Sequence, residues 1–378
     1  MQSQALRLGL IGSGFMGRTH ALAAHTAKLV FPSSAELQCE LLADFDASRA
    51  AEQAALLGFR RSTGDWREVV ADPRIDIVDV CTPNHLHYPM AKAALEQGKH
   101  VFCEKPLALG ADESRELATL AAARGCITMV GFNYVKNPVI SIAKELIDRG
   151  EIGQVRHVRG THVEDYLADP LRDGGWRTRR SLAGLGALGD LCHILSLTQR
   201  LVGEPTEVCA DFQTVIPERP DGPVENEDQM HALLRFECGA IGTIECSRIA
   251  WGRKNGLTLE ISGSAGSLFF DQERQNELWL YHADGEAPQG FRRILLGNDQ
   301  PDYAAFCPAS GHGLGFNDLK VIEMRDLVAA VAIGAPAWPD FAAAARIDAV
   351  TAAMVESCRK GGWVNVAGAV TGNTRRDC

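Results

Sequence analysis

A glycine-rich turn directly after an apolar strand constrains the fold of this chain more than any other feature. The apolar run 8–11 is followed by Gly-Ser-Gly-Phe-Met-Gly at residues 12–17, and a segment of helical composition begins inside this motif. In that context Gly12 permits a tight turn, Gly14 lets a pyrophosphate approach the backbone, and Gly17 lets helix and strand pack closely. The helix N-terminus adds N–H donors and partial positive charge. The motif therefore predicts a dinucleotide site, with a glycine-rich turn that binds nothing as the alternative.

Strand-like and helix-like segments alternate through the first third of the chain. The strand-like runs are 8–11, 41–43, 75–80, 100–103 and 127–130, and the helical segments are 14–28, 47–58, 86–98 and 112–125. Three of the helical segments end at a glycine, which is typical of a left-handed C-cap. Such alternation predicts an α/β fold with a doubly wound parallel sheet. We therefore expect a Rossmann domain over residues 1–134.

The remainder, residues 135–378, has longer β-like runs. A helix is expected at 139–149, followed by strands at 155–163, 208–215, 229–236, 240–249, 257–263 and 278–282, and by two late helices at 315–333 and 341–359. Turn signals at 237–239 and 263–266 fit hairpins, and 217–228 fits an exposed loop. This pattern predicts an α+β domain with a large, mostly antiparallel open sheet.

Composition argues against several classes of function. The 378 residues carry 48 acidic and 38 basic side chains, a formal net charge of −10, whereas nucleic-acid binding needs clustered Lys and Arg. No apolar stretch approaches the ~20 residues of a membrane span, and no signal-peptide pattern opens the chain. The eleven cysteines lack metal-ligand spacing and are interpreted as reduced thiols. We expect a cytoplasmic protein with no nucleic-acid, membrane or metal partner.

An acid follows the second strand-like run. Asp44 stands where a carboxylate could accept both hydroxyls of an adenosine ribose and would repel a 2′-phosphate. NAD is therefore favoured over NADP, although Arg49 and Arg60-Arg61 downstream could partner a phosphate. Helix capping, the structural alternative for Asp44, suits Asp46 better.

A polar cluster follows the run 75–80, at the sheet edge where open α/β folds bind ligands. It contains Thr82, Asn84 and His87. We expect Asn84 to cap the next helix with its side chain toward the cofactor. His87, one turn inside that helix, would contact the nicotinamide ribose or else face solvent.

Lys105 follows the run 100–103 and lies between Glu104 and Pro106. A flanking proline restricts the backbone and aims the lysine side chain. A confined ammonium can hydrogen-bond a substrate hydroxyl and stabilise developing alkoxide charge. The ordinary alternative is a solvated lysine at a strand end.

Asp190 and His193 follow a glycine-rich run at 184–189. Their spacing of three would place both on one helical face. An imidazole suits removal of a hydroxyl proton while hydride leaves the same carbon, and a carboxylate one turn away can orient the ring. A capping aspartate beside a packed histidine is the structural alternative.

As a set, these motifs resemble those of the Gfo/Idh/MocA family of NAD(P)-dependent oxidoreductases. The matching segments are 12–17, 82–87, 104–106, 131–134, 175–177 and 186–190 with His193, ordered and spaced as in the family. The resemblance implies a Rossmann domain, then a domain whose open sheet mediates dimers or tetramers, and a proline after the lysine that is often cis. Segments 161–180 and 311–315 look most like inositol-type and levoglucosan-type dehydrogenases. Cys192 departs from the small residue common there.

The resemblance also implies roles for individual residues. Lys105 and His193 would form the catalytic pair, assisted by Asp190. Expected cofactor contacts come from Gly12, Gly14, Phe15, Met16, Gly17, Asp44, Thr82, Asn84, His87, Glu104, Lys105 and Asn133. Expected substrate contacts come from Lys105, Asn133, Tyr166, Trp176, Arg177, Asp190, His193 and His312, because polyol recognition needs many directional hydrogen bonds. Arg177 could equally bind a carboxylate or phosphate, or form a surface salt bridge.

These observations favour an NAD-dependent dehydrogenase that oxidises a ring hydroxyl of a cyclitol or sugar. His193 would take the hydroxyl proton, Lys105 would polarise the oxygen, and hydride would pass to the nicotinamide. A levoglucosan-type anhydrosugar dehydrogenase or an aldose 1-dehydrogenase is the alternative. An oxidoreductase that recycles its own NAD and a non-catalytic NAD-sensing regulator rank below these. A homo-oligomer, dimer or tetramer, is expected from the broad β face.

Overall fold

The computed structural model describes residues 5–32, 35–283 and 289–368, which divide into two units with separate cores. The first unit comprises residues 1–136, 301–308 and 314–345, and the second comprises 137–300, 309–313 and 346–378. The expected boundary after residue 134 lies two residues before the first change of unit. No sequence signal predicts that the late segments 301–308 and 314–345 return to the first unit.

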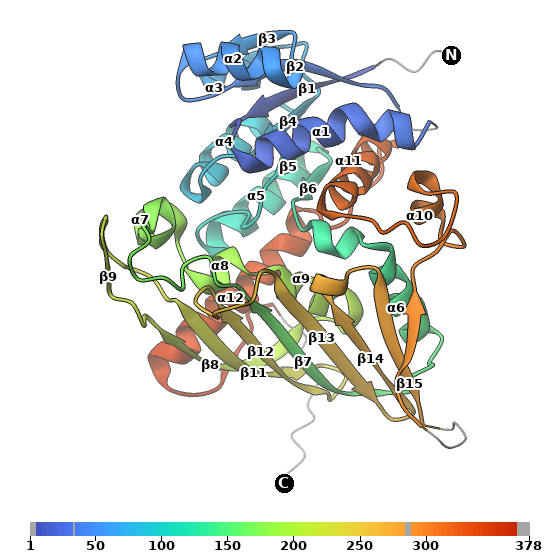
Figure 1. The fold of residues 1–378 in the computed structure, drawn as a ribbon. Coiled ribbons are helices and arrows are strands. Elements are labelled where there is room, and N and C mark those ends of the chain that lie inside the picture. Colours follow the sequence, from blue (N-terminus) through green and yellow to red (C-terminus); the bar gives the residue numbers. More distant parts are fainter. Residues whose placement is uncertain (1–4, 33–34, 284–288, 369–378) are drawn as a thin grey trace. The chain divides into compact units, whose positions relative to one another are not determined.

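A six-stranded parallel sheet forms the centre of the first unit (Figure 1), which confirms the predicted α/β fold. Its order is β3-β2-β1-β4-β5-β6. The strands are β1 (Leu6–Ile11), β2 (Leu37–Ala43), β3 (Arg61–Thr63), β4 (Ile77–Val80), β5 (His100–Cys103) and β6 (Thr128–Val130). Strand order reverses beside β1, so the carboxyl ends of β1 and β4 flank the crevice where doubly wound sheets bind ligands.

Several helices of the first unit start or stop at residues that the sequence supplies as caps. They are α1 (Phe15–Val30), α2 (Ala47–Leu57), α3 (Trp66–Ala71), α4 (His87–Glu96), α5 (Ala111–Arg124), α10 (Pro301–Phe306) and α11 (Phe316–Ile333), with 3-10 turns η1 (Asn84–Leu86) and η2 (Asn133–Lys136). Asp46 accepts a hydrogen bond from the backbone N of Arg49, and Gly58 and Gly125 are left-handed C-caps. Helix α11 lies beside α1 (Figure 1).

The second unit is built on a nine-stranded sheet of order β16-β15-β14-β13-β7-β12-β11-β8-β17. The strands are β7 (Val155–Val163), β8 (Pro205–Gln213), β11 (Gln229–Phe236), β12 (Ile241–Ser247), β13 (Gly256–Gly263), β14 (Gly266–Asp271), β15 (Glu277–His282), β16 (Arg292–Leu295) and β17 (Val364–Asn365). Among the strands that the structure describes, only β7 and β12 pair in parallel in this sheet. The predicted mostly antiparallel sheet is therefore confirmed.

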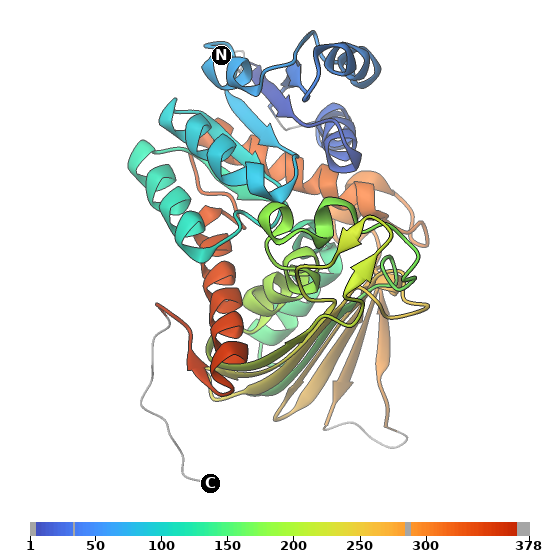
Figure 2. The same cartoon turned by 90° about the vertical axis from the view of Figure 1, so that its left-hand side faces the viewer.

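Helices cover one face of this sheet, so side chains along its strands alternate between buried and exposed positions. Along β11, Met230 and Leu234 are buried, whereas Leu233 of the same strand is exposed on the other face. Ile241 of the neighbouring β12 is exposed on that face as well. Figure 2 shows α6 (Pro138–Asp148) and α9 (His193–Leu201) above the covered face. Gly160 of β7 permits this approach, because a Cβ there would lie 2.7 Å from Ile194 of α9. The remaining helices are α7 (Arg180–Ala183), α8 (Ala187–Asp190), η3 (Gly175–Thr178), η4 (Gln272–Arg274) and α12 (Phe341–Lys360).

The segment 217–228, predicted to be an exposed loop, is one only in part. It forms a small hairpin of β9 (Glu218–Arg219) and β10 (Gly222–Pro223), and its last three residues, Asn226, Glu227 and Asp228, are buried. The prediction was wrong there because polar residues can be buried when every polar group finds a partner.

Among the helices that the structure describes, no single one is long and apolar enough to cross a membrane. Arg180–Asp190 and His193–Leu201 reach that length and composition only together, with a 47° bend between them.

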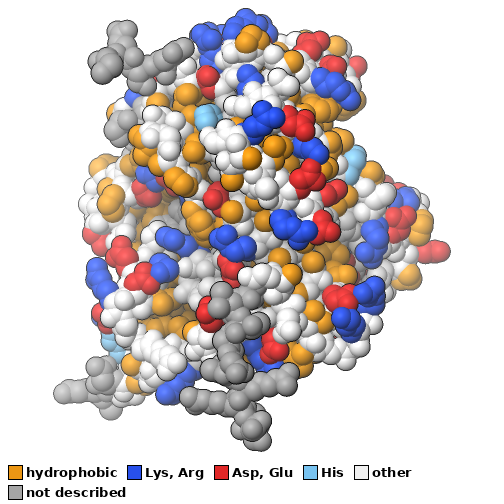
Figure 3. Space-filling view, turned by 180° about the vertical axis from the view of Figure 1, so that it is seen from behind, with side chains coloured by type: hydrophobic (Ala, Val, Ile, Leu, Met, Phe, Trp, Pro, Cys, Tyr) orange, Lys and Arg blue, Asp and Glu red, His pale blue; other side chains and the backbone are white. Residues whose placement is uncertain are grey.

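Charged side chains of both signs are interspersed over the face that Figure 3 presents. Several exposed pairs form ion pairs, such as Lys92 with Glu116 at 2.6 Å and Arg115 with Asp112 at 2.7 Å. Exposed pairs of this kind contribute at most about 1 kcal/mol each. The stability of each unit therefore depends mainly on its buried core.

Candidate active site

The three glycines of the first motif have the environments that a dinucleotide cradle needs. Gly12 has a φ of +96°, and a Cβ there would lie 2.5 Å from the carbonyl oxygen of Cys81. A Cβ on Gly17 would lie 2.0 Å from the carbonyl oxygen of Gly12. Gly14, by contrast, faces open space, with no atom within 4 Å of a Cβ. The first and third glycines therefore permit the turn, and the second leaves room at the N-terminus of α1 for a pyrophosphate.

Phe15 and Met16 open helix α1 beside this turn. The Phe15 side chain is 72% exposed and stacks on Phe316 of α11, with ring centroids 5.9 Å apart. Met16 is half-buried. Both residues belong to the first turn of α1, directly after the cradle glycine Gly14.

Asp44 is held in place by the same turn. Its Oδ2 accepts hydrogen bonds from the backbone N of Ser13 at 3.0 Å and from the Ser13 hydroxyl, and its Oδ1 accepts from the backbone N of Phe45 at 2.8 Å. Burial would raise the pKa of Asp44, but these hydrogen bonds and the guanidinium of Arg49 outweigh it and hold the pKa below its ordinary value. An ionised carboxylate therefore stands beside the cradle and disfavours a 2′-phosphate.

The cluster after β4 differs from two expectations. Helix α4 begins at His87 with Leu86 as its N-cap residue and no side-chain cap, so the prediction that Asn84 caps this helix was wrong. The intervening 3-10 turn at Asn84–Leu86 is the physical reason, because it starts the helix three residues later. Asn84 itself is buried, and Thr82 is half-buried with its hydroxyl near the sulfur of Met90.

His87 is the first residue of α4, so it does not lie one turn inside, and its side chain is buried, so the solvent-facing alternative was also wrong. Its Nδ1 lies 2.7 Å from the carbonyl oxygen of Pro106 and its Nε2 lies 2.9 Å from that of Thr82. Burial lowers the pKa of His87. A neutral His87 ring can donate to one of these carbonyls and so brace the turn that contains Lys105.

Asn133 offers an unsatisfied donor to a ligand. Its side chain is 1% exposed, and its Nδ2 has no hydrogen-bond partner among the residues that the structure describes. A buried amide without a partner is costly, and in a binding site the ligand commonly supplies that partner. Together with the open space at Gly14, this donor fits the binding of a dinucleotide or of a substrate beside it.

The Glu104-Lys105-Pro106 turn continues β5, and its Lys105–Pro106 peptide bond is cis, as the family resemblance implies. The Glu104 carboxylate is 5% exposed and binds protein groups. Its Oε1 accepts from Lys320 Nζ at 2.6 Å and from His20 Nε2 at 3.0 Å, and its Oε2 accepts from the backbone N of Lys105 at 3.2 Å. Glu104 was predicted to contact the cofactor, and that contact stays a prediction, because the structure shows only that its carboxylate is engaged inside the unit.

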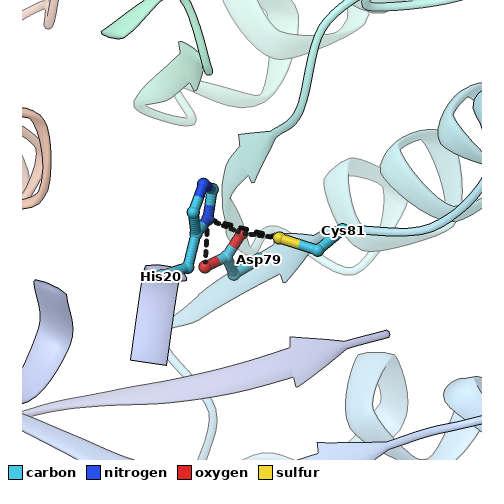
Figure 4. Close-up of side chains that lie close together, drawn as sticks. All are labelled: His20, Asp79 and Cys81. Carbon is cyan, nitrogen blue, oxygen red and sulfur yellow. Dashed lines mark hydrogen bonds and ion pairs between the residues drawn. The ribbon is translucent and has the colours of Figure 1, made fainter. Parts of the chain in front are cut away.

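Sequence reasoning missed the charged residues beneath this turn. Figure 4 shows His20 of α1 with Asp79 of β4 and with Cys81: the ring Nδ1 lies 3.0 Å from each carboxylate oxygen and 3.3 Å from the Cys81 sulfur. These three residue types can ligate metal ions, but here both His20 nitrogens are engaged by carboxylates. Asp79 inside the apolar run 75–80 is the one signal that could have pointed to the cluster.

The same cluster keeps His20 charged. Burial alone would lower its pKa, but the Asp79 charge and the hydrogen bonds that the ring donates to Asp79 and Glu104 outweigh burial and the opposing charge of Lys320, and raise the pKa to about 9. His20 is therefore an imidazolium at neutral pH.

The second unit brings together four of the predicted substrate residues. Tyr166 donates its hydroxyl to Asp190 Oδ2 at 2.5 Å, and Arg177 Nε lies 3.4 Å from the same oxygen. The Arg177 guanidinium also lies over the Trp176 ring, 4.7 Å from its centroid. Burial and the Asp190 carboxylate raise the pKa of Tyr166 well above its ordinary value, so the phenol remains protonated. The group offers both donors and acceptors to a ligand.

Asp190 and His193 do not share one helical face, so that prediction was wrong. Asp190 ends α8 and His193 begins α9. The break occurs because His162 of β7 lies with its Nδ1 2.8 Å from the carbonyl oxygen of Leu191, while the backbone N of residue 195 bonds to the carbonyl of Cys192. The His193 side chain is buried, with its ring centroid 5.7 Å from that of His162.

The buried segment 226–228 supports two members of the predicted substrate group, which comprises Tyr166, Trp176, Arg177 and Asp190. Asn226 Nδ2 donates to the carbonyl oxygen of Arg177 at 3.0 Å, and Glu227 Oε1 accepts from the backbone N of Leu188, in α8, at 3.1 Å. Arg248 also donates to the Arg177 carbonyl and pairs with Asp228 at 3.0 Å. Sequence reasoning missed this segment, and no local pattern distinguishes it from a loop.

His312 lies in the exposed segment 309–313 of the second unit, with Nδ1 3.2 Å from the carbonyl oxygen of Ala309. The predicted site residues thus form two groups. The cradle, Asp44, Asn133 and Lys105 belong to the first unit, and the group around Asp190, with His193, belongs to the second.

Comparison with protein families identifies both units. Residues 6–132 match the family described as an oxidoreductase family with an NAD-binding Rossmann fold, and residues 140–269 match the GFO/IDH/MocA C-terminal domain. The two matches cover more than half of the chain.

Individual relatives match along most of the chain or nearly all of it. A levoglucosan dehydrogenase from Pseudarthrobacter phenanthrenivorans is 39% identical over 384 residues, which cover 96% of this chain and 98% of the relative. The myo-inositol 2-dehydrogenase of Thermotoga maritima is 28% identical over 299 residues, covering 79% and 85%.

A solved structure of levoglucosan dehydrogenase in complex with NADH and levoglucosan matches with a TM-score of 0.94 at 40% identity, covering 96% of this chain and all of that one. An NAD binding oxidoreductase from Klebsiella pneumoniae matches with a TM-score of 0.93 at 43% identity, covering 97% of this chain. The predicted family resemblance is confirmed: this chain belongs to the Gfo/Idh/MocA family of oxidoreductases, and its first unit is an NAD-binding Rossmann domain.

Proposed function

We propose that this protein is an NAD-dependent dehydrogenase that oxidises a ring hydroxyl of an anhydrosugar of the levoglucosan type. The observation that supports this substrate class is the 39% identity to levoglucosan dehydrogenase over almost the full length of both chains. Similarity to the myo-inositol enzyme is lower and covers less of each chain, so cyclitols rank second.

The chemistry around Asp190 supports a neutral polyol as ligand. The Asp190 carboxylate accepts hydrogen bonds, whereas Tyr166 and Arg177 donate them, so one ring can be read at several hydroxyls. The Trp176 face beneath Arg177 adds an apolar surface suited to the C–H face of a sugar ring. The Arg177 guanidinium already faces the Asp190 carboxylate, so an anionic substrate is disfavoured.

The residues divide the reaction between them. Lys105 would donate a hydrogen bond to the reacting oxygen and stabilise its developing negative charge. His193 would accept the hydroxyl proton as the C–O bond becomes C=O. When bound, NAD supplies the acceptor for the hydride that leaves the same carbon. Asn133 would contribute its free amide donor, and Thr82, Asn84 and Asp44 would hold the cofactor.

Steady-state kinetics would test the proposed activity. Reduction of NAD is followed by NADH absorbance with levoglucosan, glucose, L-sorbose, myo-inositol and scyllo-inositol. We expect kcat/KM for levoglucosan to exceed that for either inositol by at least about tenfold. A ring with a different arrangement of hydroxyls would leave polar groups of the site without hydrogen-bond partners, which costs binding energy. Tight NAD binding without oxidation of any polyol would overturn the proposal. Oxidation of an inositol in preference would replace the substrate class.

We propose further that the exposed sheet face of the second unit, which includes Leu233 and Ile241, packs against a second copy of the chain in a dimer or tetramer. Light scattering after size exclusion would measure the assembly, and Ile241→Glu should reduce its size.

The ten described cysteines are all free thiols, which supports a cytoplasmic location.

A further inference from the structure

We infer that His20 and Lys320 are positioning residues that fix Lys105 through the buried carboxylate of Glu104. The inferred role rests on the proposed catalytic function of Lys105. His20, Asp79, Glu104, Lys320 and Glu323 together form what is named here the buried ion network.

The geometry points to Lys105 because the two Glu104 oxygens have different tasks. Oε1 receives both cations, Lys320 Nζ at 2.6 Å and His20 Nε2 at 3.0 Å. Oε2 accepts the backbone N–H of Lys105 at 3.2 Å. Since two cations anchor one end of the carboxylate, its other end offers a fixed acceptor to the residue that would do chemistry.

Each cation is in turn held from the other side. His20 is fixed by Asp79 and by stacking on the Phe102 ring, with centroids 4.5 Å apart and an interplanar angle of 11°. Lys320 pairs with Glu323 at 2.9 Å and lies 5.6 Å from the centroid of the same Phe102 ring. Neither cation can move without breaking a second contact, so the position of Glu104 is over-determined.

The space around Glu104 is tailored to the charged arrangement. A Cβ on Gly131 would lie 2.3 Å from Glu104 Oε1, so a side chain at that position would displace the carboxylate. All five members of the network are nearly or fully buried. Burying charges is expensive, and apolar residues of similar volume commonly stabilise a core as well or better. A role in placing the adjacent turn gives such a network a purpose that simple packing lacks.

Four variants test the inference in the full-length protein. Lys320→Met and His20→Gln remove one anchor each, Lys320→Arg keeps the positive charge, and Lys136→Met is the matched control. Lys136 is also a largely buried lysine bonded to α11, through Asp326 at 2.7 Å, but it does not contact Glu104 in the described structure. Readouts are kcat and KM for the sugar, the Kd of NAD by fluorescence, the primary isotope effect with substrate deuterated at the reacting carbon, and Tm.

A misplaced catalytic group costs rate even when binding persists, so we expect Lys320→Met and His20→Gln to lower kcat about 10- to 100-fold. The KM for the sugar and the Kd of NAD should change less than about threefold, and the isotope effect should rise as the chemical step becomes limiting. Lys320→Arg should recover most of kcat, and Lys136→Met should retain it. If Lys320→Met does not fold, the His20→Gln result decides alone.

Two results overturn the inference. The first is that His20→Gln and Lys320→Met keep the wild-type kcat while Lys105→Ala is inactive. The second is that kcat in these two variants falls only in proportion to the amount of folded protein that is lost. Near wild-type turnover in Lys105→Ala would instead contradict the proposed function itself, so the two failures are distinguishable.

Discussion

Lys320 and Glu104 lie 216 residues apart in the chain, and their side chains form an ion pair of 2.6 Å from which solvent is almost excluded. A late helix, α11, therefore contributes to the core of a unit that is built mainly from the first 136 residues. The pairing also links the stability of this unit to pH, through the neighbouring His20.

The charge on His20 should make stability pH-dependent. Its folded pKa of about 9 lies above the unfolded value near 6.5, so its contribution is fully present below about pH 6.5 and is lost as pH rises through 9. The difference corresponds to as much as about 3 kcal/mol. Between pH 7 and 10, Tm should fall more for the wild type than for His20→Gln. Parallel Tm curves for the two proteins would contradict the charged state.

Asp44 should set the cofactor preference. In Asp44→Ser the ribose loses its acceptor and Arg49 is released from its 3.4 Å contact, so kcat/KM for NAD should fall about 10- to 100-fold while that for NADP rises. Asp46→Ala is the control, because Asp46 caps α2 and its loss should cost about 1 kcal/mol of stability without changing the NAD to NADP ratio. An unchanged ratio in Asp44→Ser would show that selectivity lies elsewhere.

Two glycines of the motif should fail in different ways. Gly17→Ala places a methyl 2.0 Å from the Gly12 carbonyl, so it should destabilise the protein by about 1–3 kcal/mol or more. Gly14→Ala meets open space and has an allowed φ of −67°, so Tm should hardly change while the Kd of NAD rises at least about tenfold, as the methyl takes up ligand space. Thermal melts and NAD titration separate the two effects, and equal NAD affinity in Gly14→Ala would argue against this cradle.

Tyr166→Phe should lower kcat/KM for the sugar without changing the affinity for NAD. The variant removes the hydroxyl that donates to Asp190 at 2.5 Å but keeps the ring, so kcat/KM for the sugar should fall about 10- to 100-fold. Tyr88→Phe is matched to it, because the Tyr88 hydroxyl donates to the exposed Glu116 in the first unit. We expect Tyr88→Phe to have wild-type kinetics. A similar result for Tyr166→Phe would remove it from the substrate group.

Arg248 and Asp228 form an ion pair in which both side chains are fully buried, so Arg248→Met should strand a buried carboxylate at a cost of about 3–5 kcal/mol. Denaturant unfolding would measure the loss, and adding Asp228→Asn should recover part of it by removing the charge. The exposed pair of Arg159 with Glu260 serves for comparison, since Arg159→Met should cost under about 1 kcal/mol. Equal losses in the two single variants would contradict the role of burial.

Local signals predicted most of the first unit. The Gly12–Gly17 turn, the αL caps at Gly58 and Gly125 and the strand His100–Cys103 depend on residues close in sequence, and the structure has them where the pattern indicates. The return of α11 and its Lys320 depends on a partner 216 residues away, which no window of local sequence contains.

The second unit shows the same limit more sharply. The strands Val155–Val163 and Gln229–Phe236 follow alternation and were predicted to the residue. The break between α8 and α9 was missed because its cause, His162, lies on a strand 29 residues before Leu191. The buried Asn226–Asp228 segment was missed because polar composition alone cannot show that each polar group has a partner inside the protein.

Asn226–Asp228 also bears on how this protein could acquire new substrates. Three adjacent residues there support both the turn that presents Arg177 and the helix that ends at Asp190. A mutation in this short stretch would disturb two of the proposed ligand contacts simultaneously, whereas a mutation at Tyr166 or Trp176 would alter one. Divergence toward other sugars can therefore proceed by single steps at the periphery, while the support beneath it is inherited unchanged.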